Sequence, residues 1–165
     1  MYIDKYGIYI PQEEGVHAYH GNGDLDRELC KELNVEVVDL KYSGGTIIGS
    51  AKDLSIIIVF PRFMELPHEF FIEKIVEIMS EYIPEISIDR NNILIEDKKV
   101  SGSMMRHKLN SSIWATQISF EDYTNYIGAL CDKPAIKKPS YVNSDLITRD
   151  ELENKIIAWL RKEDN

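Results

Sequence analysis

Two short segments of this chain combine residue types that could assist acyl or phosphoryl transfer. The first is Ser43-Gly44-Gly45-Thr46, which separates two predicted strands. Adjacent glycines allow positive φ angles and a close approach of the backbone, so their amides can point at a phosphate or a carboxylate. The alternative interpretation is an ordinary tight turn, which uses the same residue types.

The second segment is Lys98-Lys99-Val100-Ser101-Gly102-Ser103, and we expect it to form a turn directly after a strand at 93–96. A lysine at a strand edge beside serine and glycine can neutralise the charge that develops during acyl or phosphoryl transfer. The alternative is a solvated hairpin turn whose charges only maintain solubility. Asn91 and Asn92 open the same strand. Their carbonyl oxygens could bind hydrated Mg²⁺ weakly, although asparagine is also a common turn residue.

The histidines and cysteines predict neither a metal site nor a nucleophile. No two histidines are four residues apart, and the two cysteines fit no metal-ligand spacing. The first cysteine falls on the apolar side of a predicted helix, which favours a buried thiol. These residues are His17, His20, His68, His107, Cys30 and Cys131.

Three helices are expected around the two candidate segments. Asp24 is a suitable N-cap, because apolar residues recur at helical spacing after it. Apolar residues from Phe71 to Tyr82 form one stripe, which predicts an amphipathic helix over 68–82. Thr148 and Glu151 form a capping box that begins the last helix. The segment 121–130 fits either a helix or a strand.

Strands must hold both candidate segments in place. Alternation of apolar and polar residues predicts strands at 6–10 and 15–20, paired through a turn at 11–15. The β-branched segment 54–60 predicts a central strand covered on both faces. Further strands are predicted at 35–40, 85–88, 93–96 and 112–120. This order indicates an α+β fold, with a mixed or antiparallel β-sheet flanked by helices.

Composition limits the class of protein. With 165 residues, of which 44% are hydrophobic, the chain is expected to form one domain spanning 1–165. A formal net charge of −9 argues against a nucleic-acid partner, because phosphate binding needs a basic surface. The longest apolar segment is far shorter than the ~20 residues that span a bilayer. Because a signal-peptide pattern is also absent, we expect a cytoplasmic protein that does not enter membranes.

Several segments, in one order, resemble the catalytic domain shared by lipoate-protein ligases and biotin-protein ligases. The run Val38 to Thr46 resembles their Arg-Arg-x-Ser-Gly-Gly-Gly region. The run Arg90 to Ser103 resembles Asn-Asp … Gly-Arg/Lys-Lys-Val/Ile-Ser-Gly-Ser, which is the more specific match. Trp114-Ala115-Thr116 falls where the family has His-Gly-Thr, and Tyr141-Val142-Asn143 is similar to Arg-Val-x-Asn-Leu. The resemblance extends from about Gly15 to the C-terminus.

The resemblance implies a class II synthetase-like fold and a two-step reaction. Members of the family use ATP and Mg²⁺ to convert lipoate or biotin to an acyl-adenylate, then transfer the acyl group to a lysine of a carrier domain. Lys99 would contact the acyl carbonyl and the α-phosphate. The residues expected to bind the acid and the cofactor are Ser43, Gly44, Gly45, Thr46, Asn91, Asn92, Ser101, Gly102 and Thr116, and no metal ligand is assigned.

The chain also departs from the family pattern. The arginine pair is replaced by Leu40-Lys41, the third glycine by Thr46, the aspartate of Asn-Asp by Asn92 and the histidine of His-Gly-Thr by Trp114. The family's first helix and the accessory C-terminal domain of bacterial lipoate ligases have no counterpart, so we expect an accessory subunit to be needed if the chain activates its substrate.

Two further interpretations remain open beside an ATP-dependent lipoate- or biotin-protein ligase. The chain could be a catalytically degenerate member that binds a small acid, a nucleotide or a carrier domain without adenylation. It could also share only the fold and bind an unrelated ligand, because fold does not fix function. The sequence does not distinguish lipoate from biotin or octanoate.

Overall fold

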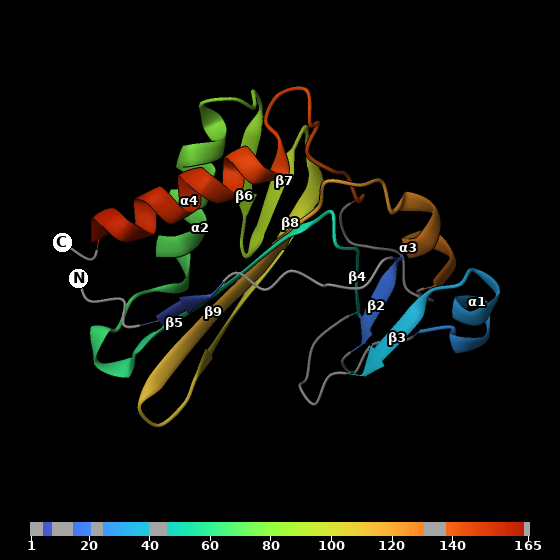
Figure 1. Cartoon of the computed structure of the whole chain (residues 1–165), viewed down its shortest axis with the longest axis horizontal. Helices are drawn as coiled ribbons and strands as arrows, with labels where there is room; N and C mark the ends of the chain where they lie inside the picture. The colour runs from blue at the N-terminus through green and yellow to red at the C-terminus, as the bar shows by residue number, and fades with distance from the viewer. Residues whose placement is uncertain (1–4, 8–14, 21–24, 40–45, 131–137, 164–165) are drawn as a thin grey trace.

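The computed structural model describes residues 5–7, 15–20, 25–39, 46–130 and 138–163. Two β-sheets lie side by side, each with helices packed beside it (Figure 1). The larger sheet carries Lys99 and most of the other described candidate site residues. The smaller sheet lies at the right of Figure 1.

The larger sheet has six strands in the order β1-β5-β9-β8-β7-β6, and every neighbouring pair is antiparallel. The strands are β1 (Lys5–Gly7), β5 (Leu54–Pro61), β6 (Ile86–Asp89), β7 (Asn92–Ile95), β8 (Lys98–His107) and β9 (Ser111–Ile118). The smaller sheet has the order β3-β2-β4, with β2 parallel to β3 and antiparallel to β4. Its strands are β2 (His17–His20), β3 (Glu36–Asp39) and β4 (Thr46–Gly49). The expected α+β fold with mixed and antiparallel pairing is confirmed.

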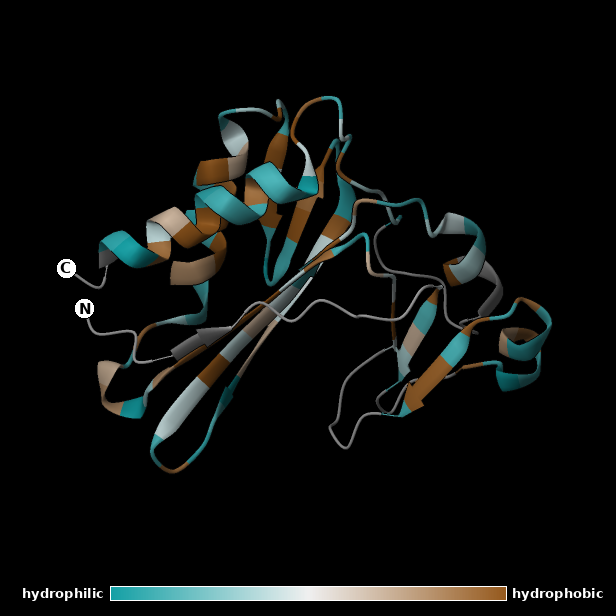
Figure 2. Cartoon of the chain, in the orientation of Figure 1, coloured by the Kyte–Doolittle hydropathy of each residue, from teal (hydrophilic) through white to brown (hydrophobic). Residues whose placement is uncertain are grey.

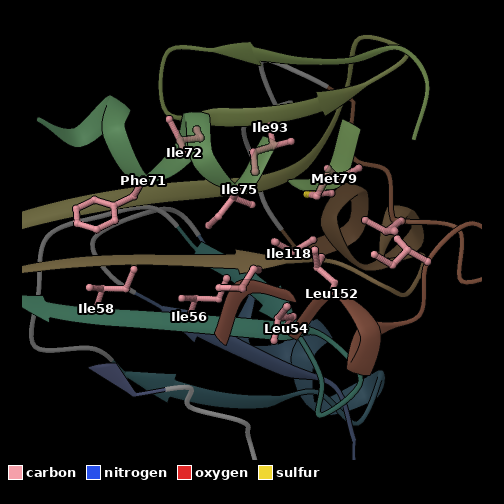
Figure 3. Packing of buried hydrophobic residues seen from close by; sticks show 14 of the residues in the cluster. Leu54, Ile56, Ile58, Phe71, Ile72, Ile75, Met79, Ile93, Ile118 and Leu152 are labelled. Carbon is pink, nitrogen blue, oxygen red and sulfur yellow. The ribbon is translucent and has the colours of Figure 1, made fainter. Parts of the chain in front are cut away.

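Helices α2 (His68–Ser80) and α4 (Arg149–Glu163) cover one face of the larger sheet and bury the main hydrophobic core. Side chains from β5, β9 and α2 point toward one another across this layer (Figure 3). The visible side of α4 is mostly hydrophilic (Figure 2). The predicted stripe of α2 is buried at Phe71, Ile72, Ile75 and Met79. The capping box is present, since Glu151 Oε2 accepts from Thr148 N at 2.9 Å.

The smaller sheet packs against α1 (Arg27–Glu32) and α3 (Thr124–Leu130) around a second cluster of buried side chains. Cys30 belongs to this cluster and is fully buried, as the sequence predicts, and burial raises the pKa of its thiol. A short 3-10 helix, η1 (Arg62–Met64), follows β5. Among the described residues, no helix is long and apolar enough to cross a membrane.

Four expectations about local structure are corrected. The segments at 6–10 and 15–20 do not pair with each other, because β1 pairs with β5 and β2 joins the smaller sheet. The N-cap of α1 is Asp26, which accepts from Leu29 N, rather than Asp24, which lies outside the described residues. Lys98 and Lys99 belong to β8 and not to a turn. Strand β5 alternates buried with partly buried residues, so only one of its faces is fully covered.

A buried carboxylate, Asp53, joins the two sheets. Its side chain accepts hydrogen bonds from Ser50 N at 3.0 Å, Phe120 N at 2.8 Å and Gln117 Nε2 at 3.1 Å. Ser50 directly follows β4, whereas Gln117 lies on β9 and Phe120 follows it. Asp53 is fully buried, and this desolvation raises the pKa of its carboxyl group despite the three donors. Arg149 Nε, at the start of α4, also donates to the Asp53 carbonyl at 3.2 Å.

We expect Asp53→Ala to lower the free energy of unfolding by at least ~3 kcal/mol, since each buried donor left without an acceptor costs about 1–3 kcal/mol. Urea unfolding followed by circular dichroism measures the loss. Asp145→Ala is the matched control, because Asp145 is exposed and surface substitutions usually change stability by less than ~0.5 kcal/mol. Equal stability of the two variants would contradict the role assigned to Asp53.

Candidate active site

The strand register divides the candidate residues between the two faces of the larger sheet. Directly paired residues in antiparallel strands point to the same face, and successive residues alternate. Trp114 and Ile118 of β9 lie in the core beneath α2 and α4. Residues an even number of positions from these two on β9, and their direct partners on β5 and β8, therefore face the helices. The residues between them point to the opposite face, called here the far face.

An extra residue in β8 places Lys99 on the far face. Ile93 of β7 pairs with Ser101, but Leu94, the next residue, pairs with Lys99, so Val100 has no partner in β7. Such a β-bulge changes the direction in which a side chain points. Without it, Lys99 and Ser101 would share a face. With it, Val100 and Ser101 are both buried while Lys99 is exposed.

The Lys99 amine lies over Gly102. A Cβ atom added to Gly102 would come within 2.9 Å of Lys99 Nζ and 3.5 Å of Asn92 Oδ1, so these groups meet on the far face. Although much of the Lys99 side chain is exposed, the surrounding protein desolvates its amine and lowers its pKa. Within the described part of the chain, no carboxylate pairs with this amine, whereas the neighbouring Lys98 contacts Glu96 at 3.3 Å.

Asp89 places a carboxyl-bearing residue on the same face, two strands away from Gly102. It pairs with Asn92, which pairs with Gly102, so all three positions form one row on the far face. Asn92 Nδ2 donates to the Asp89 carbonyl at 3.2 Å. No group of three or more metal-binding side chains exists among the described residues. One carboxylate and one amide oxygen nevertheless fit Mg²⁺, which commonly takes one or two protein ligands and completes its shell with substrate phosphates and water.

An apolar row lies next to this polar row on the far face. Gln117 of β9 pairs with Gly102 of the polar row. Two residues away on β9, Ala115 pairs with Met104 of β8 on one side and with Ile57 of β5 on the other. Ile57 and Ala115 are half-buried, and Met104 is exposed. A cation beside an apolar strip is the arrangement that an acid with an alkyl chain requires, since the chain gains from leaving water and the carboxylate needs a counter-charge.

Gln117 connects this face to the smaller sheet. Its Nε2 donates to the Ile48 carbonyl at 3.3 Å and to Asp53 Oδ2. The same amide packs against Gly49, where an added Cβ would come within 2.0 Å of Nε2. Strand β4 runs from Thr46 to Gly49, so Gln117 fixes one end of the strand that follows the Ser43–Gly45 segment. Thr46 itself is within 3.1 Å of His20 Nδ1 through its hydroxyl.

Of the other predicted site residues that the structure describes, Asn91, Ser101 and Thr116 do not point toward Lys99. Ser101 and Thr116 face the helices, where Ser101 Oγ donates to Thr116 Oγ1 at 2.6 Å, because Thr116 donates to the Gly102 carbonyl at 3.1 Å. Asn91 is bound to the backbone of Ser103. Ser43, Gly44, Gly45, Leu40 and Lys41 lie outside the described residues. Trp114 is fully buried in the core.

Sequence reasoning missed Asp89, Gln117 and Gly49. Asp89 becomes visible once the turn at 90–91 is assigned, since it is then the first residue before a two-residue hairpin and must pair with Asn92. Gln117 is a long polar side chain on the face opposite Trp114, but polar residues also occur on the other face of β9, so the sequence does not single it out. Gly49 has no signal in the sequence either, because only the approach of Gln117 explains why a side chain does not fit there.

Known proteins resemble this chain in structure, whereas comparison of its sequence finds no match. No family model and no curated protein matches the chain. A bipartite lipoate protein ligase of the archaeal lipoylation system from Thermoplasma acidophilum superposes with a TM-score of 0.72 at 14% identity, over 87% of this chain and 65% of that one. A candidate lipoate protein ligase from the same organism, with bound lipoic acid, gives 0.73 at 13%, over 96% and 73%. A lipoate-protein ligase A bound with ATP gives 0.69 at 15%, over 87% and 66%.

The chain therefore has the α+β fold of lipoate-protein ligase catalytic domains, as the sequence resemblance implies. Identities of 13–15% establish the fold alone. The chain spans just under two thirds of the bipartite ligase's length.

We expect Gly102→Ala to displace the Lys99 amine while changing the free energy of unfolding by only about 1 kcal/mol, because a flexible side-chain end can move away from the new methyl group. Displacement into water should raise the pKa of Lys99 toward its ordinary value. Titration of ¹³C-labelled lysine by NMR measures this shift, with Lys98 as the internal reference. An unchanged Lys99 titration would contradict the packing of the amine on Gly102.

Proposed function

We propose that the chain is a lipoate-protein ligase-like enzyme, acting as one domain over 1–165. It would activate a lipoate-type carboxylate with ATP and transfer the acyl group to a carrier-protein lysine. The observation that carries the proposal is Lys99, a desolvated amine without a carboxylate partner in the described part of a chain whose net charge is −9. An anionic ligand on the far face would supply the missing counter-charge.

The far face provides a role for each group. The alkyl chain of the acid would lie along Ile57, Ala115 and Met104, with its carboxylate toward Lys99. A carboxylate oxygen would attack the α-phosphorus of ATP, the bond to the β-phosphate oxygen would break, and pyrophosphate would leave. The Lys99 ammonium would neutralise the charge that develops on the transferred group, where a fixed cation has the greatest effect.

Asp89 and Asn92 would hold Mg²⁺ together with the phosphates, and the ion would supply further positive charge to the pyrophosphate that leaves. In the second step, the amine of a carrier lysine would attack the acyl carbon, lose a proton and displace AMP. Lys99 would again stabilise the oxyanion of the tetrahedral intermediate. The carrier domain and an accessory subunit remain proposed partners; one structural relative is itself bipartite.

One observation favours a second candidate, a binding protein that holds the acid without adenylating it. Trp114 stands where the family has a histidine, and it is fully buried between Phe71 and the sheet, with its ring centroid 5.3 Å from that of Phe71. It cannot contact a ligand on the far face. The binding-protein candidate retains the same acid site but gives no role to Asp89.

Calorimetric titration with lipoate, biotin and octanoate, each with and without Mg²⁺-ATP, followed by mass spectrometry for the acyl-AMP, tests the proposal. We expect one acid to bind and to yield its acyl-AMP only when Mg²⁺-ATP is present. Binding without acyl-AMP formation would replace the ligase with the binding-protein candidate. Absence of binding by all three acids would contradict both.

Lys99→Ala should lower the rate of acyl-AMP formation at least ~100-fold, the range observed when one stabilising group is removed from a transition state. Lys98→Ala is the matched control, because it removes an adjacent lysine from the same strand whose amine already contacts Glu96. Its rate should stay near that of the unmodified protein. Similar rates for both variants would exclude Lys99 as the stabilising group.

A further inference from the structure

Strand β8 has a neighbouring strand on its β7 side only in its first half. Strand β7 pairs with it from Lys98 to Gly102, while β9 pairs with its other side from Ser101 to His107. On the β7 side, the described residues contain no strand next to Ser103–His107. A free strand edge of this kind is a template for pairing with another chain.

The backbone N–H and C=O groups of alternate residues along this edge point away from β9. Ser103 N donates to the Asn91 carbonyl at 2.8 Å, and Asn91 Nδ2 donates to the Ser103 carbonyl at 2.9 Å, so the amide and the carbonyl of Ser103 point away from β9. In antiparallel pairing this direction recurs every second residue. The N–H and C=O groups of Met105 and His107 therefore point the same way, and no described residue bonds them.

A shallow, open cavity of about 540 Å³ lies along this edge. Four residues of β8 line one side, and residues that lead into α2 line the other. Because adjacent residues of one strand point to opposite faces, their joint presence shows that the cavity runs along the backbone edge. The lining residues are Leu66, Pro67, His68, Asn91, Ser103, Met104, Met105 and His107.

The β8–β9 hairpin that carries the edge is basic and apolar in an otherwise acidic chain, although the exposed Glu65 and Glu69 flank the opposite wall at Leu66–His68. No Asp or Glu stands between Asp97 and Glu121, an interval that holds Arg106 and Lys108. Arg62 of η1 lies against the β8–β9 turn, with its Nη1 donating to the Lys108 carbonyl at 3.4 Å. Phe63 is 81% exposed and Leu109 is 91% exposed beside these cations. Figure 1 shows this hairpin extending away from the helices.

We propose that an extended, acidic segment of a partner protein adds as a strand to the Ser103–His107 edge of β8. Its backbone would pair with Met105 and His107, and its carboxylates would lie near Arg106 and Lys108. Strand addition of this type takes its affinity from backbone hydrogen bonds and its specificity from side-chain positions. A second copy of this chain is a poorer occupant, because self-pairing would bring the cations of two edges together.

A hexapeptide of alternating valine and glutamate, acetylated and amidated, serves as the probe. Binding is measured by fluorescence anisotropy on the full chain, and amide shifts are followed by NMR. We expect dissociation constants below about 1 mM and the largest amide shifts at Met105 and His107. The same peptide with lysine in place of glutamate should bind at least tenfold more weakly.

Backbone methylation of the peptide separates strand addition from charge attraction alone. One version carries N-methyl groups on residues 2 and 4 and the other on residues 3 and 5, so only one version loses the amides that face β8. We expect one to lose binding at least tenfold and the other to retain it. Equal affinity of the two versions would overturn the proposal.

Lys108→Glu should weaken binding severalfold, whereas Lys162→Glu, an equal charge change on the exposed surface of α4, should not. Equal effects would overturn the proposal, as would no binding at about 1 mM peptide. A dimer that forms without peptide and is lost in Lys108→Glu would assign the edge to a second copy instead. Because neither readout involves acyl-AMP, failure here leaves the proposed enzyme activity unaffected.

Discussion

The bulge at Val100 is the constraint on which the candidate site depends. Side-chain direction alternates along a strand, so one additional residue exchanges the two faces for everything on one side of it. Here the exchange leaves Val100 and Ser101 in the core and turns Lys99 toward Asn92 and Gly102. A regular ladder would direct the lysine into an apolar layer, where burying its charge is strongly unfavourable. The bulge therefore allows one strand to contribute both to the core and to the site.

The register that makes the bulge useful is held by polar contacts between the two sheets. Gln117 pairs with Gly102 on the far face and donates to Asp53 and to the end of β4. A slip of one residue in β9 would send Gln117 into the core and break both contacts. Asp53 is costly to bury, yet its three donors stabilise one arrangement of the sheets over its alternatives.

Local patterns predicted the elements that depend on local interactions. Helix α2 and the capping box of α4 follow from residues within a few positions of each other. The pairing of β1 with β5 joins residues about fifty positions apart, and no neighbouring residue signals it. The bulge is equally hidden, because Lys98 to Ser103 looks the same as a turn or as a strand. Because the bulge is not visible in the sequence, Ser101 and Thr116 are predicted to lie beside Lys99, whereas the structure places them on the opposite face of the sheet.

Trp114, which stands where the resembled ligases have a histidine, has a structural role that bears on the chemistry. Trp114 fills the core-facing position in contact with Phe71, so this position contributes to packing rather than to a ligand site. Among the described residues, the far face offers the Lys99 amine, the Asp89 carboxylate and the side-chain amides of Asn92 and Gln117. Such a set can bind and polarise a carboxylate. Any adenylation would therefore rest on charge stabilisation by Lys99 and a metal ion, with the substrate acid already ionised at neutral pH.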